Sequence, residues 1–304
     1  MDKKSIVIVT GTGGPLGTGH MQRMLGLASY MEEKGDFDIS ILPMAGDYRF
    51  PAEFTGMVTK TLPAKADLII RDMRDSSESE ILSLSKIAPV LAVDDAGSGR
   101  ALAAHPVNIL PLPSPGGGTR PDMEKFLYGY NFSRGIESIP EEGGAERDID
   151  IAVYAGFSPP TEILPLIERS LPGDARSVIF SSGRPVPLTG KPLAGEPSYA
   201  GILTRAKIIM THFGITMFEA NVCGCMVAAL NPTPYHGKLT SLVMKDMSII
   251  HSAEYGTFDP VLMNDDLLQN LKKKCGLRIP AGDIINRINS GRENFTKYIY
   301  KILM

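Results

Sequence analysis

Short apolar runs rich in β-branched residues alternate along this chain with stretches in which apolar residues recur every three to four positions. In the first half the runs are SIVIVT, DISILPM, ADLIIRD, APVLAVDD and VNILPLP. The clearest helical spacing follows the first run, at Met21, Met24, Leu25, Ala28 and Met31. Continuous apolar strands separated by helices predict a parallel sheet that is buried on both faces.

The alternation stops at residues 138–148, SIPEEGGAERD, a charged stretch without apolar periodicity that is typical of a linker. It resumes with the runs DIDIAVYAGF, SVIFSSG, KIIMTHFG, MVAALNP and SIIH. Helices are expected from about Pro160, near Tyr199, from Ile215 and over residues 282–304. The pattern predicts an α/β chain of two doubly wound parallel-sheet domains, residues 1–140 and 149–304, with the last helix packing back on the first domain. Ligands bind beyond the carboxyl ends of such strands, so the expected site is a cleft between the domains.

The composition narrows the class of protein. The 304 residues are 43% hydrophobic and 21% charged, with a net charge of −3, and so lack the basic excess of proteins that bind nucleic acid or anionic membranes. No apolar stretch approaches the ~20 residues that span a bilayer, and the run at residues 5–9 is too short for a signal peptide. Cys223 and Cys225 lie in apolar sequence without a second pair to complete a zinc site. We therefore expect buried thiols, no metal and a reducing, cytoplasmic location; nothing in the sequence indicates an oligomeric state.

A glycine-rich segment, GTGGPLGTGHMQR at residues 11–23, follows the first predicted strand. Glycines let the main chain approach a ligand closely, and the helix start behind them offers free N–H groups. The segment is not a P-loop, because no Gly-Lys-Ser/Thr closes it, and it is a poor dinucleotide fingerprint, because its third glycine comes one residue late. The candidate ligand-binding glycines are Gly13, Gly14, Gly17 and Gly19.

The first strongly functional side chains after this segment are His20 and Arg23. Histidine is suited to taking a proton at neutral pH, which makes His20 a candidate general base. The alternative is that His20 caps the helix or packs against it. Arg23 lies one turn further on, where it either holds an anion or is a solvated charge on the helix.

Two turns in the second half also lead from a strand into a helix. In FGITMFEANVCG, residues 213–224, Gly214 and Thr216 can cradle a phosphate, with Glu219 accepting hydrogen bonds from a ribose. The alternative is a capping box, in which Thr216 is the N-cap and Glu219 its partner. In GFSPP, residues 156–160, Ser158 either reaches a phosphate or caps the helix ahead of a proline at its first position.

Four segments together carry a resemblance to a known family: GTGHMQRMLGLA, VDDAGSGRALAAHPVNIL, YAGFSPP and THFGITMFEANVCGCMVAAL. In this order, over most of the chain, they resemble the UDP-sugar hydrolases of the pseudaminic acid pathway and the related spore-coat polysaccharide glycosyltransferase-like proteins. Both groups belong to the GT-B superfamily. The resemblance implies a GT-B fold with two Rossmann-like domains and the nucleotide mainly on the second.

The resemblance also implies roles for single residues. His20 matches the histidine that activates water in the hydrolases. Asp94 and Asp95 match an acidic pair that faces the sugar, although both can equally be turn residues before Gly97. The diphosphate loop and the ribose-binding acid correspond to Gly214, Ile215, Thr216 and Glu219, and the glycine-rich turn facing the phosphates to Gly156 and Ser158.

One departure from the family lies after the run MVAALNP, where relatives carry Asn-Gln and this chain has TPYHGKL. His236 or Lys238 can replace the missing amides at a phosphate or a sugar. The first loop is also longer and richer in glycine than in relatives, and GFSPP replaces a turn that usually reads Gly-Gly, a polar residue and Asp-Pro.

These features predict an enzyme that hydrolyses or transfers the sugar of a UDP-linked sugar at its anomeric carbon, in surface-glycan or nonulosonic-acid-type biosynthesis, without a cofactor or metal. A glycosyltransferase with a hydroxyl acceptor is the first alternative, because both reactions need a base in the same place. A non-catalytic protein that binds nucleotide sugars on the same fold is the second alternative.

Overall fold

The chain divides into two compact units, one of Met1–Arg134 with Arg287–Met304 and one of Gly135–Asn286. The computed structural model describes residues 3–11, 18–44, 49–110, 136, 139, 146–154, 156, 161–180, 186–188, 197–244, 247–273 and 279–304. The sequence analysis placed the end of the first domain at residue 140. The first unit ends at Arg134 and is completed by the last residues of the chain.

The first unit contains a sheet of five parallel strands in the order β2-β1-β3-β4-β5. The strands are β1 (Lys4–Thr10), β2 (Phe37–Pro43), β3 (Leu68–Asp72), β4 (Val90–Val93) and β5 (His105–Val107). The helices between them are α1 (Gly19–Lys34) and α2 (Glu78–Ser85), with the short 3-10 helices η2 (Ala52–Phe54) and η3 (Ser98–Leu102). The sequence predicted the fifth strand at VNILPLP, but the strand ends at Val107.

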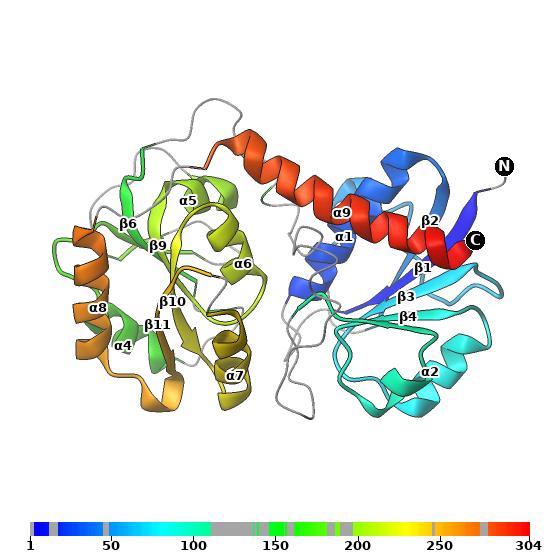
Figure 1. Ribbon diagram of the computed structural model, residues 1–304, viewed down its shortest axis with the longest axis horizontal. Helices are drawn as coiled ribbons and strands as arrows, with labels where there is room; N and C mark the ends of the chain where they lie inside the picture. The colour runs from blue at the N-terminus through cyan, green and yellow to red at the C-terminus, as the bar shows by residue number, and fades with distance from the viewer. Residues whose placement is uncertain are drawn as a thin grey trace. The chain divides into compact units, whose positions relative to one another are not determined.

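Both faces of this sheet are buried, because its strands are apolar at nearly every position. Alternate residues point to opposite faces, so Ile6 and Ile8 join one core and Val7 and Val9 the other. The first core contains the apolar face of α1 and the C-terminal part of α9 (Ala281–Leu303), and the second contains α2 (Figure 1). The predicted helical spacing is confirmed, since Met21, Met24, Leu25, Ala28 and Met31 are all buried.

Local sequence signals fix where the helices begin and end. Helix α1 stops at Gly35, which adopts a left-handed φ of 80° that glycine reaches without strain. Helix α2 begins after Ser77, whose side chain accepts a hydrogen bond from the Glu80 N–H. Among the described residues, the same signals recur in the second unit, where Thr233 and Asp259 cap helices that each start with a proline.

The second unit contains a sheet of six strands in the order β11-β10-β9-β6-β7-β8, in which only the short edge strand β8 is antiparallel. The strands are β6 (Ile149–Val153), β7 (Ser177–Ile179), β8 (Val186–Pro187), β9 (Ala206–Thr211), β10 (Met226–Asn231) and β11 (Ile249–Glu254). The helices are α4 (Ile163–Ser170), α5 (Tyr199–Arg205), α6 (Ile215–Val222), α7 (Pro234–Val243) and α8 (Pro260–Lys272), with the 3-10 helix η6 (Tyr255–Thr257). The sequence did not predict β8.

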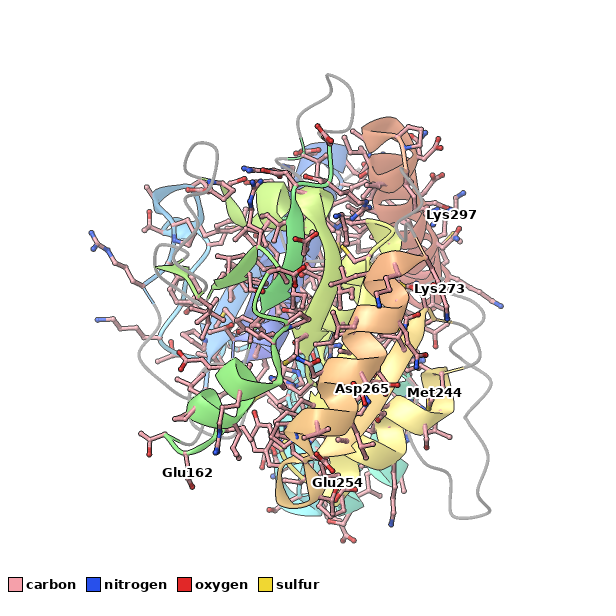
Figure 2. All side chains as sticks on the ribbon, turned by 90° about the vertical axis from the view of Figure 1, so that its left-hand side faces the viewer. Glu162, Met244, Glu254, Asp265, Lys273 and Lys297 are labelled. Atoms are coloured by element: carbon pink, nitrogen blue, oxygen red, sulfur yellow. The ribbon has the colours of Figure 1, made fainter. Side chains whose placement is uncertain are left out.

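Helices α4 and α8 cover one face of this sheet, and α6 and α7 lie on its other side (Figure 1). Met263 and Leu267 of α8 are fully buried against the strands, whereas Asp265 is exposed on the outer side of the helix (Figure 2). The predicted burial of the two cysteines is confirmed, because Cys223 and Cys225 are buried free thiols. Cys275 lies outside the described residues.

No helix in the described part of the chain combines the length and the apolar character needed to cross a membrane.

The C-terminal part of α9 is an integral part of the first unit. Phe295 and Ile299 are fully buried in the core formed by β1, β3 and α1. Near the helix end, the Tyr300 ring packs on Phe37 at 4.9 Å between centroids, and its hydroxyl donates a hydrogen bond to Asp36. The first unit is therefore assembled from both ends of the chain.

We predict that Phe295→Ala lowers the free energy of unfolding by about 3–5 kcal/mol, because it empties a filled core site. Urea denaturation followed by circular dichroism measures the change. The matched control is Lys297→Ala on the same helix. The Lys297 side chain, labelled in Figure 2, is 66% exposed, and its ion pair within the described part of the chain is with the exposed Glu293. Its loss is therefore expected to change stability by less than about 1 kcal/mol. Equal effects of the two substitutions would contradict the assigned packing of α9.

Candidate functional site

The strand order of the first unit identifies the place where a ligand is expected. Beyond β1 the chain forms β2 on one side of it and β3 on the other, so the sheet has a switch point between β1 and β3. Ligands of open α/β sheets bind at the carboxyl ends of the strands at such a point. His20 lies in the first turn of α1, which follows β1, and Asp72 is the last residue of β3.

His20 and Asp72 form a directed pair at this switch point. The His20 Nδ1 lies 2.8 Å from Asp72 Oδ1, and the Asp72 side chain has no exposed surface. Burial alone raises the pKa of the Asp72 carboxyl, but the charges of Arg23 and His20 outweigh it and bring the pKa to about 2. An ionised carboxylate can only accept, so His20 Nδ1 is the donor and Nε2 is the nitrogen able to take a proton. The residue before α1, Thr18, makes no side-chain cap, and His20 is bound to Asp72 rather than to the helix end.

Arg23 joins Asp72 to Asp94. Its Nε donates to Asp72 Oδ2 at 2.6 Å, a terminal nitrogen donates to Asp72 Oδ1, and the other terminal nitrogen lies 2.8 Å from Asp94 Oδ2. The Arg23 side chain is 1% exposed, so the alternative that it is a solvated charge on the helix is wrong. The anion it holds is a pair of buried carboxylates of the chain itself.

The two aspartates after β4 have different surroundings. Asp94 Oδ1 accepts hydrogen bonds from the N–H groups of Ile109 and Leu110, at 2.7 and 2.9 Å, and its other oxygen faces Arg23. Burial raises the pKa of Asp94, and the nearby Arg23 opposes that rise. Asp95 instead accepts from the Ser76 and Gly97 N–H groups and the Ser76 hydroxyl, and pairs with Arg71. His20, Asp72 and Arg23 form one connected group, called the His20 group below. The structure brings Asp94, but not Asp95, into contact with it. Asp95 has the contacts of a turn residue before Gly97, as the alternative interpretation proposed.

A second switch point lies between β6 and β9 of the second unit, because β7 pairs on one side of β6 and β9 on the other. Gly156, shortly after β6, adopts a φ of +101°, and a Cβ there would lie 2.9 Å from Nε2 of His212. Nδ1 of His212 lies 2.8 Å from the carbonyl oxygen of Phe213 and donates to it, because a carbonyl only accepts. The His212 ring thus lies directly beside Gly156, at the carboxyl ends of the two central strands.

Gly214 is the residue that precedes α6, and no side chain caps this helix. Its backbone is extended (φ 162°, ψ −175°), so a side chain at this position is not strained. The capping-box interpretation of Thr216 and Glu219 is therefore wrong, since Thr216 lies inside the helix. The first N–H groups of α6, which begins at Ile215, are available to an anion.

Glu219 lies inside α6 with no exposed surface. It accepts a hydrogen bond from the Tyr199 hydroxyl, which is also 3.1 Å from Thr216 Oγ1. Burial, and then the charge of Glu219, raise the pKa of Tyr199 well above its usual range. Burial and the same charge also raise the pKa of Tyr154, at the end of β6. Glu219 has no exposed surface in this structure that a ribose diol could reach.

His236, which the sequence analysis named as a replacement for the missing amides, lies in the first turn of α7. Its Nδ1 is 2.8 Å from Thr233 Oγ1, and its ring centroid is 6.1 Å from that of His212. The ring of His236 in α7 therefore lies close to that of His212, which follows β9 and contacts Gly214. Asn231, the last residue of β10, accepts a hydrogen bond from the Phe213 N–H at 3.1 Å and so fixes the turn before Gly214.

The positions of the remaining predicted site residues say little about their function. Gly19 is the first residue of α1, and Ile215 is the first residue of α6. Gly13, Gly14, Gly17 and Ser158 lie outside the described residues. Within the described part of the chain, no three His, Cys, Asp or Glu side chains are grouped so that they could hold a metal ion.

Sequence reasoning missed three residues of these groups: Asp72, Tyr199 and His212. Asp72 ends the run ADLIIRD, and an acid at the end of a buried strand was a usable signal. His212 ends the run KIIMTH and was not named as a candidate. Tyr199 carries no sequence signal, because only the fold brings α5 next to α6.

Comparison with known proteins supports the fold. Neither the protein-family models nor the curated proteins searched match this sequence. Solved structures do: the spinosyn rhamnosyltransferase SpnG has a TM-score of 0.57 at 12% identity, covering 98% of this chain and 100% of that one. MurG of Acinetobacter baumannii has a TM-score of 0.54 at 15% identity, covering 98% and 99%. Arabidopsis thaliana UGT89C1, solved with UDP-L-rhamnose, has a TM-score of 0.53 at 12% identity, covering all of both chains.

These likenesses show that the chain has the α/β fold of GT-B glycosyltransferases, as the sequence predicted. At this level of identity they establish the fold and leave the reaction to be argued from the residues.

The Tyr199→Phe substitution is expected to lower the free energy of unfolding by about 1–3 kcal/mol, because it leaves the buried Glu219 without the hydroxyl that donates to it. Thermal and urea denaturation measure the change. Tyr30→Phe on α1 is the matched control, since the described contact of Tyr30 is made by its ring with Lys34 and needs no hydroxyl. A Tyr199→Phe protein as stable as the control would contradict the buried contact.

Gly156→Ala and Gly214→Ala are expected to separate two kinds of glycine. Gly156→Ala places a Cβ at positive φ and against His212, and should destabilise the protein by about 1–3 kcal/mol. Gly214→Ala meets His212 at 3.5 Å, an ordinary contact on extended backbone, and should leave the unfolding midpoint within about 0.5 kcal/mol of the parent value. Denaturant midpoints of the two variants provide the comparison, and the reverse order of stability would contradict this geometry.

Proposed function

We propose that the chain is a glycosyltransferase that uses a nucleotide-diphosphate sugar. The observation that carries the proposal is the His20–Asp72 pair at the carboxyl ends of β1 and β3, in which Nδ1 is held by an ionised carboxylate and Nε2 can take a proton. General-base catalysis by a positioned histidine typically contributes about 10²–10⁴ in rate.

In the proposed reaction, His20 Nε2 takes the proton of the acceptor's hydroxyl group. The oxygen of that hydroxyl forms a bond to the anomeric carbon of the donor sugar. The bond from that carbon to the diphosphate oxygen breaks, and the leaving diphosphate keeps the electron pair and gains negative charge. Taken by itself, the second unit is proposed to bind the nucleotide diphosphate through the N–H groups at the start of α6, behind Gly214, with Thr216 in the first turn. His212, which lies next to Gly156 and Gly214, and His236, whose ring is 6.1 Å from that of His212, are proposed to contact the phosphates or the sugar.

The choice of transfer over hydrolysis follows the comparisons. The sequence favoured a hydrolase, but the similar structures named above include glycosyltransferases, one of them solved with UDP-L-rhamnose. That ligand also supports the preference for a UDP-linked donor. Surface-glycan or nonulosonic-acid-type biosynthesis remains the proposed setting, on the resemblance of the four sequence segments alone, and the free thiols of Cys223 and Cys225 fit the proposed cytoplasmic location.

The proposed role of Glu219 is narrower than the resemblance implied. A carboxylate without exposed surface that is engaged by Tyr199 holds α5 against α6 in this state. It would contact a ribose only after Tyr199 had turned away. Asp95 is likewise not part of the proposed site, because its oxygens are engaged by Ser76, Gly97 and Arg71.

The test is to incubate the protein with UDP-, dTDP-, GDP- and CMP-sugars, with and without a panel of small alcohols, sugars and phenols, and to measure nucleotide release by chromatography. Release that depends on an acceptor supports transfer, and equal release in water alone supports hydrolysis. His20→Ala should lower turnover on the order of 10²–10⁴-fold while UDP binding, measured by calorimetry, stays unchanged.

The matched control is His105→Ala, a part-buried histidine of β5 in the same unit whose pKa is lowered by burial. It should retain turnover. Nucleotide binding without release for any sugar or acceptor would favour the non-catalytic alternative, and full turnover in His20→Ala would remove His20 from the mechanism.

A further inference from the structure

The contacts around His20 extend beyond its pair with Asp72. They continue from Asp72 through Arg23 to Asp94, and from Asp94 to the main chain after β5. The contacts join four segments of the first unit: α1, β3, the residue after β4, and Ile109 and Leu110. Arg23 and Asp72 have 1% and 0% of their side chains exposed, and Asp94 has 5%.

The geometry of Arg23 restricts how Asp72 can lie. A guanidinium that donates through Nε and a terminal nitrogen to both oxygens of one carboxylate fixes the plane of that carboxylate. Asp72 Oδ1 is thereby held where His20 Nδ1 meets it at 2.8 Å. The remaining terminal nitrogen of Arg23 is the one that faces Asp94, so Asp94 sets the position of Arg23 itself.

The backbone of Asp94 supports a role for its charge. Its φ of 49° is the one positive value at a non-glycine residue in the described part of the chain. Asparagine adopts this conformation as readily as aspartate, and its side-chain oxygen could still accept from Ile109 and Leu110. The turn alone therefore does not require a carboxylate. The feature that asparagine cannot supply is the second anionic oxygen facing Arg23.

We propose that Arg23 and Asp94 are positioning residues for His20: Asp94 anchors Arg23, Arg23 orients Asp72, and Asp72 holds His20 in the tautomer and direction that catalysis needs. This inference rests on the proposed function for its effect on turnover. It does not rest on it for its effect on the His20 ring, which can be observed in the protein without any substrate.

The experiment is to compare Asp94→Asn with the parent protein by kinetics and by ¹⁵N NMR of the histidine rings. Asp94→Asn should lower kcat on the order of 10–100-fold, with KM for the donor unchanged, because misplacing a catalytic group weakens the chemical step more than binding. The parent spectrum should show a slowly exchanging Nδ1–H on His20 at neutral pH. The variant should show loss of that signal or a mixture of tautomers.

Two further comparisons separate positioning from general damage. Asp94→Asn placed in the His20→Ala background should cause little further loss of turnover, because its effect acts through His20. Glu80→Gln is the matched control: it neutralises an acid that pairs at 2.8 Å with a buried arginine of the same sheet, Arg71, outside the His20 group. It should leave both kcat and the His20 signal unchanged.

The outcomes distinguish the two claims. If no donor is turned over by the parent protein, the proposed function fails, while the His20 ring signals still decide the positioning claim. Unchanged kcat and an unchanged His20 tautomer in Asp94→Asn would overturn that claim.

If Asp94→Asn does not fold, the Arg23→Lys variant decides instead. Lysine keeps the positive charge but cannot fix the plane of the Asp72 carboxylate. A parent-like His20 signal in Arg23→Lys would equally overturn the claim. Should neither variant fold, absence of a protected Nδ1–H on His20 in the parent protein overturns it.

Discussion

The arrangement of side chains at the carboxyl ends of β1 and β3 depends on the buried carboxylate of Asp72. A carboxylate without exposed surface has lost its hydration and persists as an ion only if cations and donors replace the lost water. Arg23 and His20 supply this replacement, and both come from the first two turns of the helix that follows β1. One electrostatic requirement therefore determines the direction of the histidine, the burial of the arginine and the contact of the helix with β3. Asp94 adds a second buried acid to the same arginine, so the loss of Arg23 would leave both carboxylates buried without that cation.

The second unit meets a similar requirement by different means. Glu219 is also fully buried, and one of its partners is a neutral hydroxyl, that of Tyr199. Burial, and then the charge of Glu219, raise the pKa of the nearby Tyr154 and Tyr199. The two units thus have the same order of strands around a switch point, but the chemical groups at the two switch points differ. The first has a charged, directed base, and the second has glycines, N–H groups and two imidazoles suited to an anionic ligand.

Periodicity and strand-end position were sufficient to predict most of the architecture. The apolar runs located nine of the eleven described strands, because strands buried on both faces have almost no polar interruption. The fifth strand was predicted at VNILPLP but lies at His105–Val107, because proline occurs both inside edge strands and in the loops beyond them. Strand β8 was not predicted, because its two residues are too few to show a pattern. His20 was predicted as a candidate because it follows a glycine-rich turn, and its pairing with Asp72 is what the structure adds. Asp72 was missed because an aspartate that ends a strand looks like any turn residue until its distance from His20 is known.

The residue-level errors share a cause. Arg23 looked like a solvated charge because helix position alone does not reveal a carboxylate that arrives from a strand 49 residues away in sequence. Thr216 and Glu219 matched a capping box because that motif is local. The helix instead begins at Ile215, after Gly214, and the glutamate is bound by a tyrosine of another helix. In each case the pairing partner comes from a distant segment, and such pairings are set by the fold rather than by spacing.

The dependence of the first unit on the end of α9 has a consequence for synthesis of the chain. The residues of the second unit are continuous in sequence, so this unit can reach its final packing while the chain is still being made. The first unit lacks Phe295 and Ile299 until residues 287–304 have been translated. The unit that begins to emerge from the ribosome first therefore completes its core only after the whole second unit has been synthesised.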